Sequence, residues 1–191
     1  MTTADKLTAS RIILAPVFFA TFLAYRSGYV PPIPALVALW LLFVYMEVSD
    51  LLDGLAARSS STVSDFGKLF DPFADVLARL TYFLCFAIDG IMPVWILLLV
   101  LYREYSIMFL RMLLTRRGIA MGARPGGKAK AVVYMSAGLL SLAVVTFRAF
   151  PALPGLGMAE MLTMVAYMLA AVLSVASFID YIVQYRKLSA S

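Results

Sequence analysis

The sequence predicts an all-α polytopic membrane protein with six transmembrane helices and with both the amino and the carboxyl terminus in the cytoplasm. Hydrophobic residues make up 63% of its 191 residues and charged residues only 14%, whereas soluble domains contain about 25% charged residues. Six apolar runs approach the length of a membrane-spanning helix, and basic residues gather in the connections on one side. We expect a single membrane domain over residues 1–191.

The six apolar runs differ in length. A hydrocarbon core of about 30 Å requires about 20 helical residues, so the short first and fifth runs must extend into their flanks. The predicted spans are residues 12–25, 33–49, 73–92, 94–114, 131–147 and 161–183.

The first three spans have distinct boundaries. The first follows a basic flank, but the segment AYRSG after it is a poor signal-peptidase site, so we expect an uncleaved helix. The second begins after the proline-rich connection 26–34. The third begins near Pro72, which can bend or restart a helix.

The last three spans follow turn-forming connections. The fourth comes after DGIMP (89–93) and places Arg103 and Glu104 deep in an apolar run, which predicts a water-filled cavity or a pairing partner for these charges. The fifth follows the basic, glycine-rich segment 116–130, and the sixth follows FPALPGLG (150–157).

The distribution of basic residues predicts the orientation. With the amino terminus inside, the outer side holds only Arg26 and Arg148, which is a strong positive-inside signal. The inner side holds Lys6, Arg11, Arg58, Lys68, Arg116, Arg117, Arg124, Lys128, Lys130, Arg186 and Lys187. At a membrane face these charges suit anionic lipids or phosphorylated substrates, and we expect no nucleic-acid partner.

Several kinds of chemistry are excluded by composition. The chain contains no histidine and a single cysteine, Cys85. Histidine bases, Ser-His-Asp triads, cysteine metal sites and disulfides within the chain are therefore ruled out. Any catalysis must use carboxylates, hydroxyls, basic residues or bound metal.

Five of the eleven acidic residues lie between residues 49 and 75. Asp50 and Asp53 are three residues apart, and Asp71 and Asp75 are four apart, so each pair occupies one stripe of a helix. Asp65 lies off both stripes and reads as a helix-start residue. Two neighbouring helices would thus present four carboxylates to a shared space.

Four clustered carboxylates repel one another unless protons or cations neutralise them. Oxygen-only ligands favour Mg²⁺, Mn²⁺ or Ca²⁺ over zinc, and a pair of divalent ions suits phosphoryl transfer. Gly54, Ala57 and Gly67 leave room for a ligand, and the Arg58 guanidinium could hold a phosphate oxygen. The alternative is helix packing through small residues, with aspartates placed in the membrane interface.

These residues form, without a gap, the pattern D-x2-D-G-x2-A-R-x8-G-x3-D-x3-D. The sequence thereby resembles the CDP-alcohol phosphotransferase family. The resemblance implies a multi-pass enzyme of the bacterial inner (cytoplasmic) membrane, with its active site facing the cytoplasm. Such an enzyme transfers a substituted phosphate from a CDP-linked donor to an alcohol and releases CMP.

The resemblance also implies roles for individual residues. Asp75 becomes the general base and, with the other three aspartates, a ligand to two Mg²⁺ (or Mn²⁺) ions. The implied metal ligands are Asp50, Asp53, Asp71 and Asp75. The implied contacts to the CDP-linked donor are Thr8, Arg11, Gly54, Ala57, Arg58 and Gly67.

The opening segment DKLTASRIILAPVFF (5–19) resembles the N-x-L-T-x-x-R-x-x-x-x-P start of the family's bacterial phosphatidylglycerophosphate synthases, with Asp5 in place of Asn. Taken without the resemblance, Thr8 and Arg11 read equally well as a helix cap and a positively charged membrane anchor.

Basic residues further along the chain point to the acceptor. Arg103 and Arg111 lie about two turns apart on one face of the fourth span, and Lys128 and Lys130 form a G-K-x-K segment. Both patterns resemble the same synthase group, although Ala131 stands where Thr commonly follows. All four residues could bind a phosphate on the acceptor; the lysines could instead be solvated charges near anionic lipid.

We therefore expect transfer of the phosphatidyl group of CDP-diacylglycerol to sn-glycerol 3-phosphate. Alternatives are a related synthase that uses inositol phosphate, serine or phosphatidylglycerol, and a cation-coupled transporter, which should carry charges through to the outer face. The expected partners are the two substrates, membrane lipids and, from the resemblance, a second copy of the chain in a homodimer.

Overall fold

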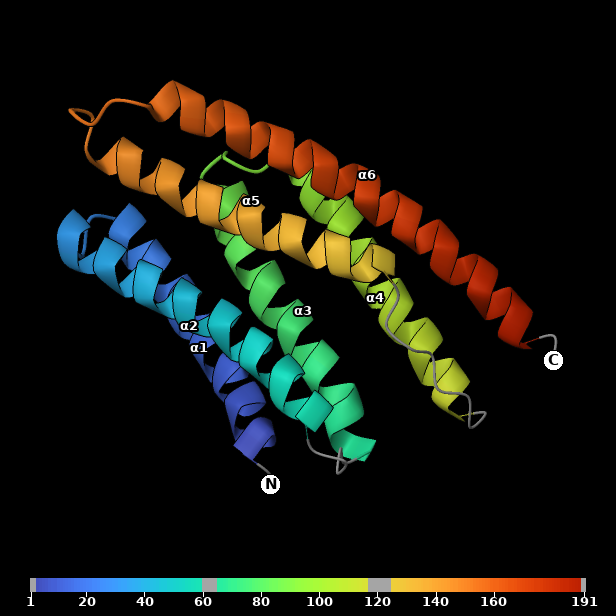
Figure 1. Cartoon of the computed structure of the whole chain (residues 1–191). Helices are drawn as coiled ribbons and strands as arrows, with labels where there is room; N and C mark the ends of the chain where they lie inside the picture. Colours follow the sequence, from blue (N-terminus) through green and yellow to red (C-terminus); the bar gives the residue numbers. More distant parts are fainter. Residues whose placement is uncertain (1–2, 60–64, 117–124, 190–191) are drawn as a thin grey trace. The chain divides into compact units, whose positions relative to one another are not determined.

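The computed structural model describes the backbone of residues 3–59, 65–116 and 125–189, and the side chains of residues 7–49, 70–116 and 129–188. All regular structure in these residues is helical, which confirms the all-α prediction. The helices are α1 (Thr3–Arg26), α2 (Pro32–Ser59), α3 (Asp65–Ile88), α4 (Val94–Arg116), α5 (Pro125–Ala149) and α6 (Leu156–Ser189) (Figure 1).

Two compact units divide the chain, Met1–Phe86 and Ala87–Ser191. The first holds α1, α2 and almost all of α3, and the second holds α4, α5 and α6. Each unit is described by itself below. The single domain expected over residues 1–191 stays a prediction.

In the first unit, α1 and α2 pack against each other. Gly28 turns the chain between them with a φ of 75°, a conformation that suits glycine. Helix α3 contributes Tyr82, whose ring lies 6.4 Å from that of Phe18 in α1 and 5.2 Å from that of Phe43 in α2. These buried aromatic contacts join all three helices.

Helix α3 is continuous through Pro72 and begins at Asp65. The proline therefore does not restart the helix, although it removes one backbone donor. The start at Asp65 confirms the prediction that this residue opens the helix.

In the second unit, α6 packs against both α5 and α4. Two buried hydroxyl pairs connect α5 to α6: Ser141 with Tyr167 at 2.6 Å, and Tyr134 with Ser174 at 2.5 Å. Such pairs satisfy polar groups that would otherwise be buried without a partner.

Within the described side chains, four helices are long and apolar enough to cross a membrane, over Leu7–Arg26, Pro32–Ser49, Ala129–Ala149 and Leu156–Leu188. Helices α3 and α4 fall short of this measure. In α4, the charges of Arg103, Glu104 and Arg111 interrupt the apolar run. The six spans and the cytoplasmic termini therefore stay predictions.

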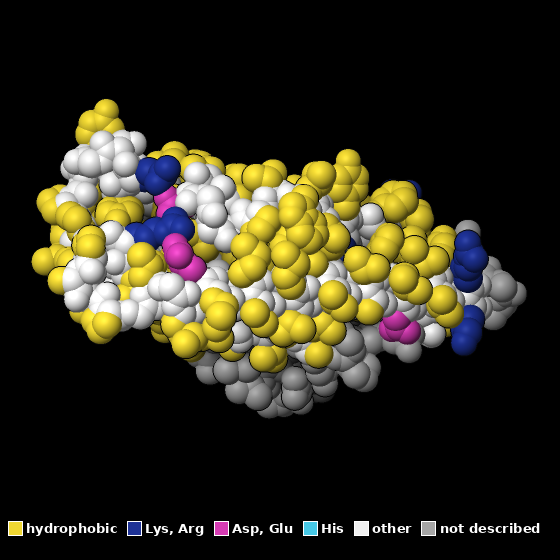
Figure 2. All heavy atoms as spheres, turned by 90° about the horizontal axis from the view of Figure 1, so that it is seen from above, with side chains coloured by type: hydrophobic (Ala, Val, Ile, Leu, Met, Phe, Trp, Pro, Cys, Tyr) yellow, Lys and Arg dark blue, Asp and Glu magenta, His cyan; other side chains and the backbone are white. Residues whose placement is uncertain are grey.

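Large apolar side chains cover much of the surface (Figure 2). Ile13 in α1, Leu41 in α2 and Val172 in α6 are 68%, 67% and 65% exposed. Apolar exposure on this scale is typical of helices that face lipid rather than water.

Candidate active site

The predicted site begins where α1 meets the amino-terminal half of α3. Thr8 Oγ1 donates a hydrogen bond of 2.5 Å to Asp71 Oδ1. Arg11 Nη1 donates to Asp75 Oδ1 and forms an ion pair with it. Thr8 and Arg11 lie three residues apart on α1, and Asp71 and Asp75 lie four apart on α3, so two helix faces meet through matched polar side chains.

Both α1 residues are fully enclosed, whereas the carboxylates are more accessible. Thr8 is 0% exposed and Arg11 is 1% exposed, but the side chain of Asp75 retains 24% exposure. Arg11 Nη2 also donates to Thr8 Oγ1 over 3.3 Å. A buried guanidinium needs a charged partner, and Asp75 supplies it while keeping part of its surface open to a ligand.

A second cluster of charged side chains lies within the second unit. Glu104 accepts hydrogen bonds from Arg103 Nη1, at 3.1 and 3.0 Å, and from Lys130 Nζ. Ser177 Oγ accepts two more from the Arg103 guanidinium, from Nε at 3.3 Å and Nη2 at 3.0 Å. Four of these residues, from α4, α5 and α6, are buried: Arg103, Glu104, Lys130 and Ser177.

Tyr181 connects a third cation to this cluster. Arg111 Nη2 donates a 2.6 Å hydrogen bond to the Tyr181 hydroxyl. The guanidinium carbons of Arg103 and Arg111 lie 5.6 and 5.4 Å from the centre of the Tyr181 ring, within cation–π range. Glu104 pairs with Arg103 and Lys130, and Arg111 shares Tyr181 with Arg103, so these four charged side chains carry an excess of two positive charges.

A model of the CDP-alcohol phosphatidyltransferase family matches residues 1–176. The chain belongs to this family. Among its relatives, the CDP-diacylglycerol–glycerol-3-phosphate 3-phosphatidyltransferase of Treponema pallidum is 41% identical over 95% of this chain and 88% of its own length. The enzyme of the same name from Bacillus subtilis is 32% identical over 66% of this chain and 68% of its own.

A further relative is the probable phosphatidylglycerophosphate synthase of Mycobacterium tuberculosis. It is 31% identical over 94% of this chain and 79% of its own length. Membership of the CDP-alcohol phosphatidyltransferase family makes the chain a transferase, as its carboxylate pattern predicts.

Several residues of the family pattern lie outside the described side chains. Their backbones are helical, within α2, α3 and α5. They are Asp50, Asp53, Gly54, Ala57, Arg58, Gly67 and Lys128. Their predicted roles as metal ligands or substrate contacts stay predictions.

The part of the metal set that is described fits a divalent ion in its chemistry. Asp71 and Asp75 offer carboxylate oxygens one helical turn apart, which are the hard donors that Mg²⁺ and Mn²⁺ prefer. Among the described side chains, which do not include those of Asp50 and Asp53, no three potential ligands come together.

Arg103 and Glu104, for which the sequence predicts a water-filled cavity or a pairing partner, pair with each other and with Ser177 and Lys130. Ser177 and Tyr181 were not expected at this site. They lie four residues apart on α6, so their common face was the one signal available. The contacts of Thr8 and Arg11 with Asp71 and Asp75 were likewise unexpected, because nothing local links residues more than sixty positions apart.

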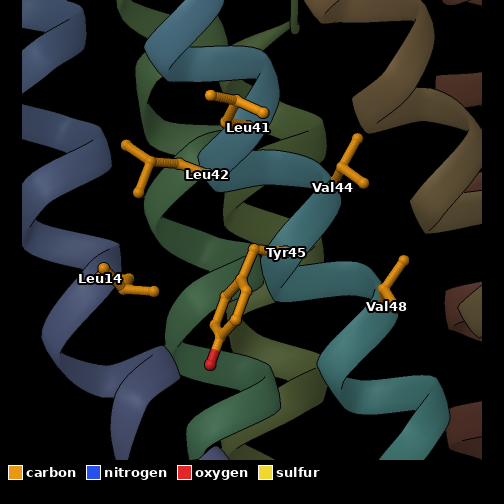
Figure 3. Close-up of a pocket in the computed structure, with 6 residues that line it drawn as sticks. All are labelled: Leu14, Leu41, Leu42, Val44, Tyr45 and Val48. Carbon is orange, nitrogen blue, oxygen red and sulfur yellow. The ribbon is translucent and has the colours of Figure 1, made fainter.

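An apolar groove lies between α1 and α2 in the first unit (Figure 3). Its volume is about 520 Å³ and its lining comprises Leu14, Leu41, Leu42, Val44, Tyr45 and Val48. The Tyr45 hydroxyl is hydrogen-bonded to Ser10 Oγ at 2.9 Å. Ser10 lies between Thr8 and Arg11 in sequence, so the groove runs close to the residues that contact the α3 carboxylates.

Proposed function

We propose that the chain transfers the phosphatidyl group of CDP-diacylglycerol to sn-glycerol 3-phosphate, giving phosphatidylglycerophosphate and CMP. The observation that carries the choice of acceptor is the cluster of Arg103, Arg111 and Lys130, of which Arg103 and Lys130 are buried. Its excess of two positive charges complements a phosphate monoester, which carries about −1.5 to −2 charges near neutral pH. The names of the relatives support the same reaction.

The donor is assigned to the first unit. Two Mg²⁺ or Mn²⁺ ions, held by Asp50, Asp53, Asp71 and Asp75, would neutralise the diphosphate and the departing CMP. Thr8 and Arg11 hold the Asp71 and Asp75 carboxylates in place through their hydrogen bonds. The remaining contacts with the donor are assigned to Gly54, Ala57, Arg58 and Gly67.

Asp75 acts as the general base. Its carboxylate, which is paired with Arg11 and partly exposed, accepts the proton of the acceptor's primary hydroxyl. The hydroxyl oxygen then forms a bond with the phosphorus of the phosphatidyl group. The bond between that phosphorus and the bridging oxygen breaks, and CMP leaves with the bonding electron pair.

The acceptor phosphate is assigned to Arg103, Arg111, Lys128 and Lys130. Arginine offers paired N–H donors that match phosphate oxygens. Arg111 is well suited because its Nε is buried and has no hydrogen-bond partner among the described residues. Serine, which has no phosphate, would leave this cluster without its counter-ion.

The apolar groove between α1 and α2 is assigned to an acyl chain of the donor. Its apolar lining suits a hydrocarbon chain. The Ser10–Tyr45 hydrogen bond lies within one helical turn of Thr8 and Arg11 along α1. A donor bound in this way keeps its acyl chain in lipid and its diphosphate at the carboxylates.

The membrane arrangement is part of the proposal. We infer six transmembrane helices, cytoplasmic termini and an active site on the cytoplasmic side of the bacterial inner membrane. The segregation of basic residues supports this orientation. We also infer a homodimer, from the family resemblance alone.

One assay tests the reaction. Purified protein is supplied with CDP-diacylglycerol, Mg²⁺ and one of several acceptors, and CMP release is measured. We expect turnover with glycerol 3-phosphate and none without a divalent metal. Turnover with inositol phosphate, serine or phosphatidylglycerol but not with glycerol 3-phosphate would overturn the acceptor assignment, and full activity in excess chelator would overturn the role of the metal.

A further inference from the structure

A buried polar group in the first unit has no part in the proposed reaction. Tyr82 of α3 donates a 2.9 Å hydrogen bond to Glu47 Oε1 of α2. Arg79 Nη2 lies 3.7 Å from Glu47 Oε2, and Arg79 Nε donates to the Tyr82 hydroxyl over 3.2 Å. Both carboxylate oxygens of Glu47 are thus engaged by α3.

This group is enclosed by apolar surroundings. The Glu47 and Arg79 side chains are 11% and 12% exposed, and Tyr82 is 1% exposed. The Tyr82 ring packs against Phe43 and Phe83 at 5.2 and 5.0 Å. Apolar residues of similar volume often replace a buried ion pair without loss of stability, so the pair calls for a role beyond stability.

The position of the pair along the helices indicates that role. On α2, Glu47 precedes Asp50 by three residues, and on α3, Arg79 follows Asp75 by four. Residues three or four apart lie on the same helix face, about 5 to 6 Å apart along the axis. The Glu47–Arg79 contact therefore lies one turn from the proposed metal ligands, on the same faces of the same two helices.

A contact at that place determines the rotation and the axial position of α2 relative to α3. If either helix rotated or slid by part of a turn, the carboxylate of Glu47 would lose Arg79 and Tyr82. The same movement would change the distance between the two ligand pairs. The directional hydrogen bond to Glu47 Oε1 and the ion pair at Glu47 Oε2 resist such movement better than apolar packing, which tolerates small shifts.

We propose that Glu47 and Arg79, with Tyr82, are positioning residues that hold α2 and α3 in the register required for metal binding. This inference rests on the proposed function, because it takes Asp50, Asp53, Asp71 and Asp75 to be the metal ligands. It also assigns Glu47 a structural role rather than that of a fifth ligand, although it lies on the ligand face of α2.

The test is direct metal binding by the purified full chain without substrates. Mn²⁺ affinity is measured by electron paramagnetic resonance, and the Mg²⁺ concentration for half-maximal CMP release is measured separately. Removal of groups that orient metal ligands typically weakens metal affinity about 10- to 100-fold. We expect Arg79→Met to weaken Mn²⁺ binding and to raise the Mg²⁺ requirement within that range, with the acceptor KM unchanged.

Two variants keep the test decisive if Arg79→Met does not fold. Tyr82→Phe removes the hydrogen bonds that the hydroxyl makes with Glu47 and Arg79 but keeps the ion pair between those two residues, so a smaller loss of Mn²⁺ affinity is expected. Arg79→Lys retains the charge and should recover part of the affinity. Arg148→Met, which breaks an exposed ion pair with Asp89 in the second unit, is the matched control and should bind Mn²⁺ as the parent does.

The Mn²⁺ measurements distinguish a wrong metal site from a wrong positioning role. If the parent chain binds no Mn²⁺, or binds it equally well after Asp75→Asn, the metal site of the proposed function is wrong. If the parent binds Mn²⁺ and the folded Arg79 and Tyr82 variants bind it equally well, the positioning role is wrong and the metal site stands.

Discussion

At the scale of one residue, Arg11 shows how a buried charge on one helix contacts a predicted metal ligand on another. It is almost entirely buried and meets Asp75 of α3, while its neighbour Thr8 meets Asp71. The four-aspartate pattern could be predicted from spacing alone, because a helix places every third or fourth residue on one face. These contacts could not be predicted, because they depend on which helices pack together.

Replacement of Asp75 by asparagine tests the base. Asparagine can still accept a hydrogen bond from Arg11 but cannot take up a proton, and because it removes the charged partner of a buried guanidinium, folding of the variant is checked alongside its activity. Loss of general-base catalysis typically costs about 10²- to 10⁴-fold, and we expect the rate of CMP release to fall within this range. Asp89→Asn serves as control, since Asp89 pairs with Arg148. Unchanged turnover in a folded Asp75→Asn protein contradicts the assignment.

Arg111→Ala tests the phosphate pocket. A hydrogen bond to a charged group contributes about 1.5–3 kcal/mol, and each 1.4 kcal/mol is about tenfold in affinity. We therefore expect the KM for glycerol 3-phosphate to rise about tenfold or more and the KM for CDP-diacylglycerol to stay constant. The control is Arg148→Ala. An equal rise in both KM values would count against a phosphate role for Arg111.

At the scale of the elements, α3 and α4 each carry charged side chains that pair with another helix. Their existence and approximate limits follow from the apolar runs between turn-forming residues. How their charges are satisfied does not follow, since Glu104 of α4 pairs with Lys130 of α5 and Glu47 of α2 pairs with Arg79 of α3. Partners of this kind come from tertiary packing.

The hydroxyl pairs between α5 and α6 allow a stability prediction. Hydrogen bonds between membrane helices contribute about 0.6 kcal/mol on average and at most about 1.7. Tyr167→Phe, which removes the bond to Ser141, should lower the free energy of unfolding by an amount in that range. Unfolding in mixed detergent measures it, with Tyr105→Phe at an exposed position as control. A loss of several kcal/mol means that the tyrosine does more than bridge the two helices.

The groove between α1 and α2 leads to a prediction about the donor. Val44→Trp places a large side chain in the lining and should slow CMP release from long-chain CDP-diacylglycerol more than from a short-chain donor. Val172→Trp, on an exposed part of α6, is the control and should affect both donors equally. The acyl-chain assignment is wrong if Val44→Trp also affects both equally.

At the scale of the whole molecule, the sequence predicts the fold class and the family better than it predicts how the helices are arranged. Composition and the aspartate pattern lead to the all-α fold and the family, and the family match over residues 1–176 agrees with both. Among the residues that the structure describes, hydropathy supports four helices as candidate spans and leaves out α3 and α4. The charges of α3 and α4 count against them in a linear measure of hydropathy, which does not include the pairing of those charges.

Topology can be tested with introduced cysteines, because the one native cysteine, Cys85, is buried. With six spans and an inner amino terminus, a membrane-impermeant thiol reagent should label Ala152→Cys from outside in intact cells. The same reagent should label Ser191→Cys only after the membrane has been permeabilised. Labelling of Ser191→Cys in intact cells contradicts an even number of spans starting from the inside.

The groove described between α1 and α2 is open along its side, with Leu41, Val44 and Val48 largely exposed. On the proposed function, the donor then arrives by lateral diffusion and its diacylglycerol part stays in one leaflet throughout. The concentration that governs its capture is its mole fraction among neighbouring lipids, whereas glycerol 3-phosphate responds to volume concentration. The protein thus joins a substrate that diffuses in the plane of the membrane to one that diffuses in solution. Added inert phospholipid lowers the mole fraction of the donor and leaves the concentration of glycerol 3-phosphate unchanged.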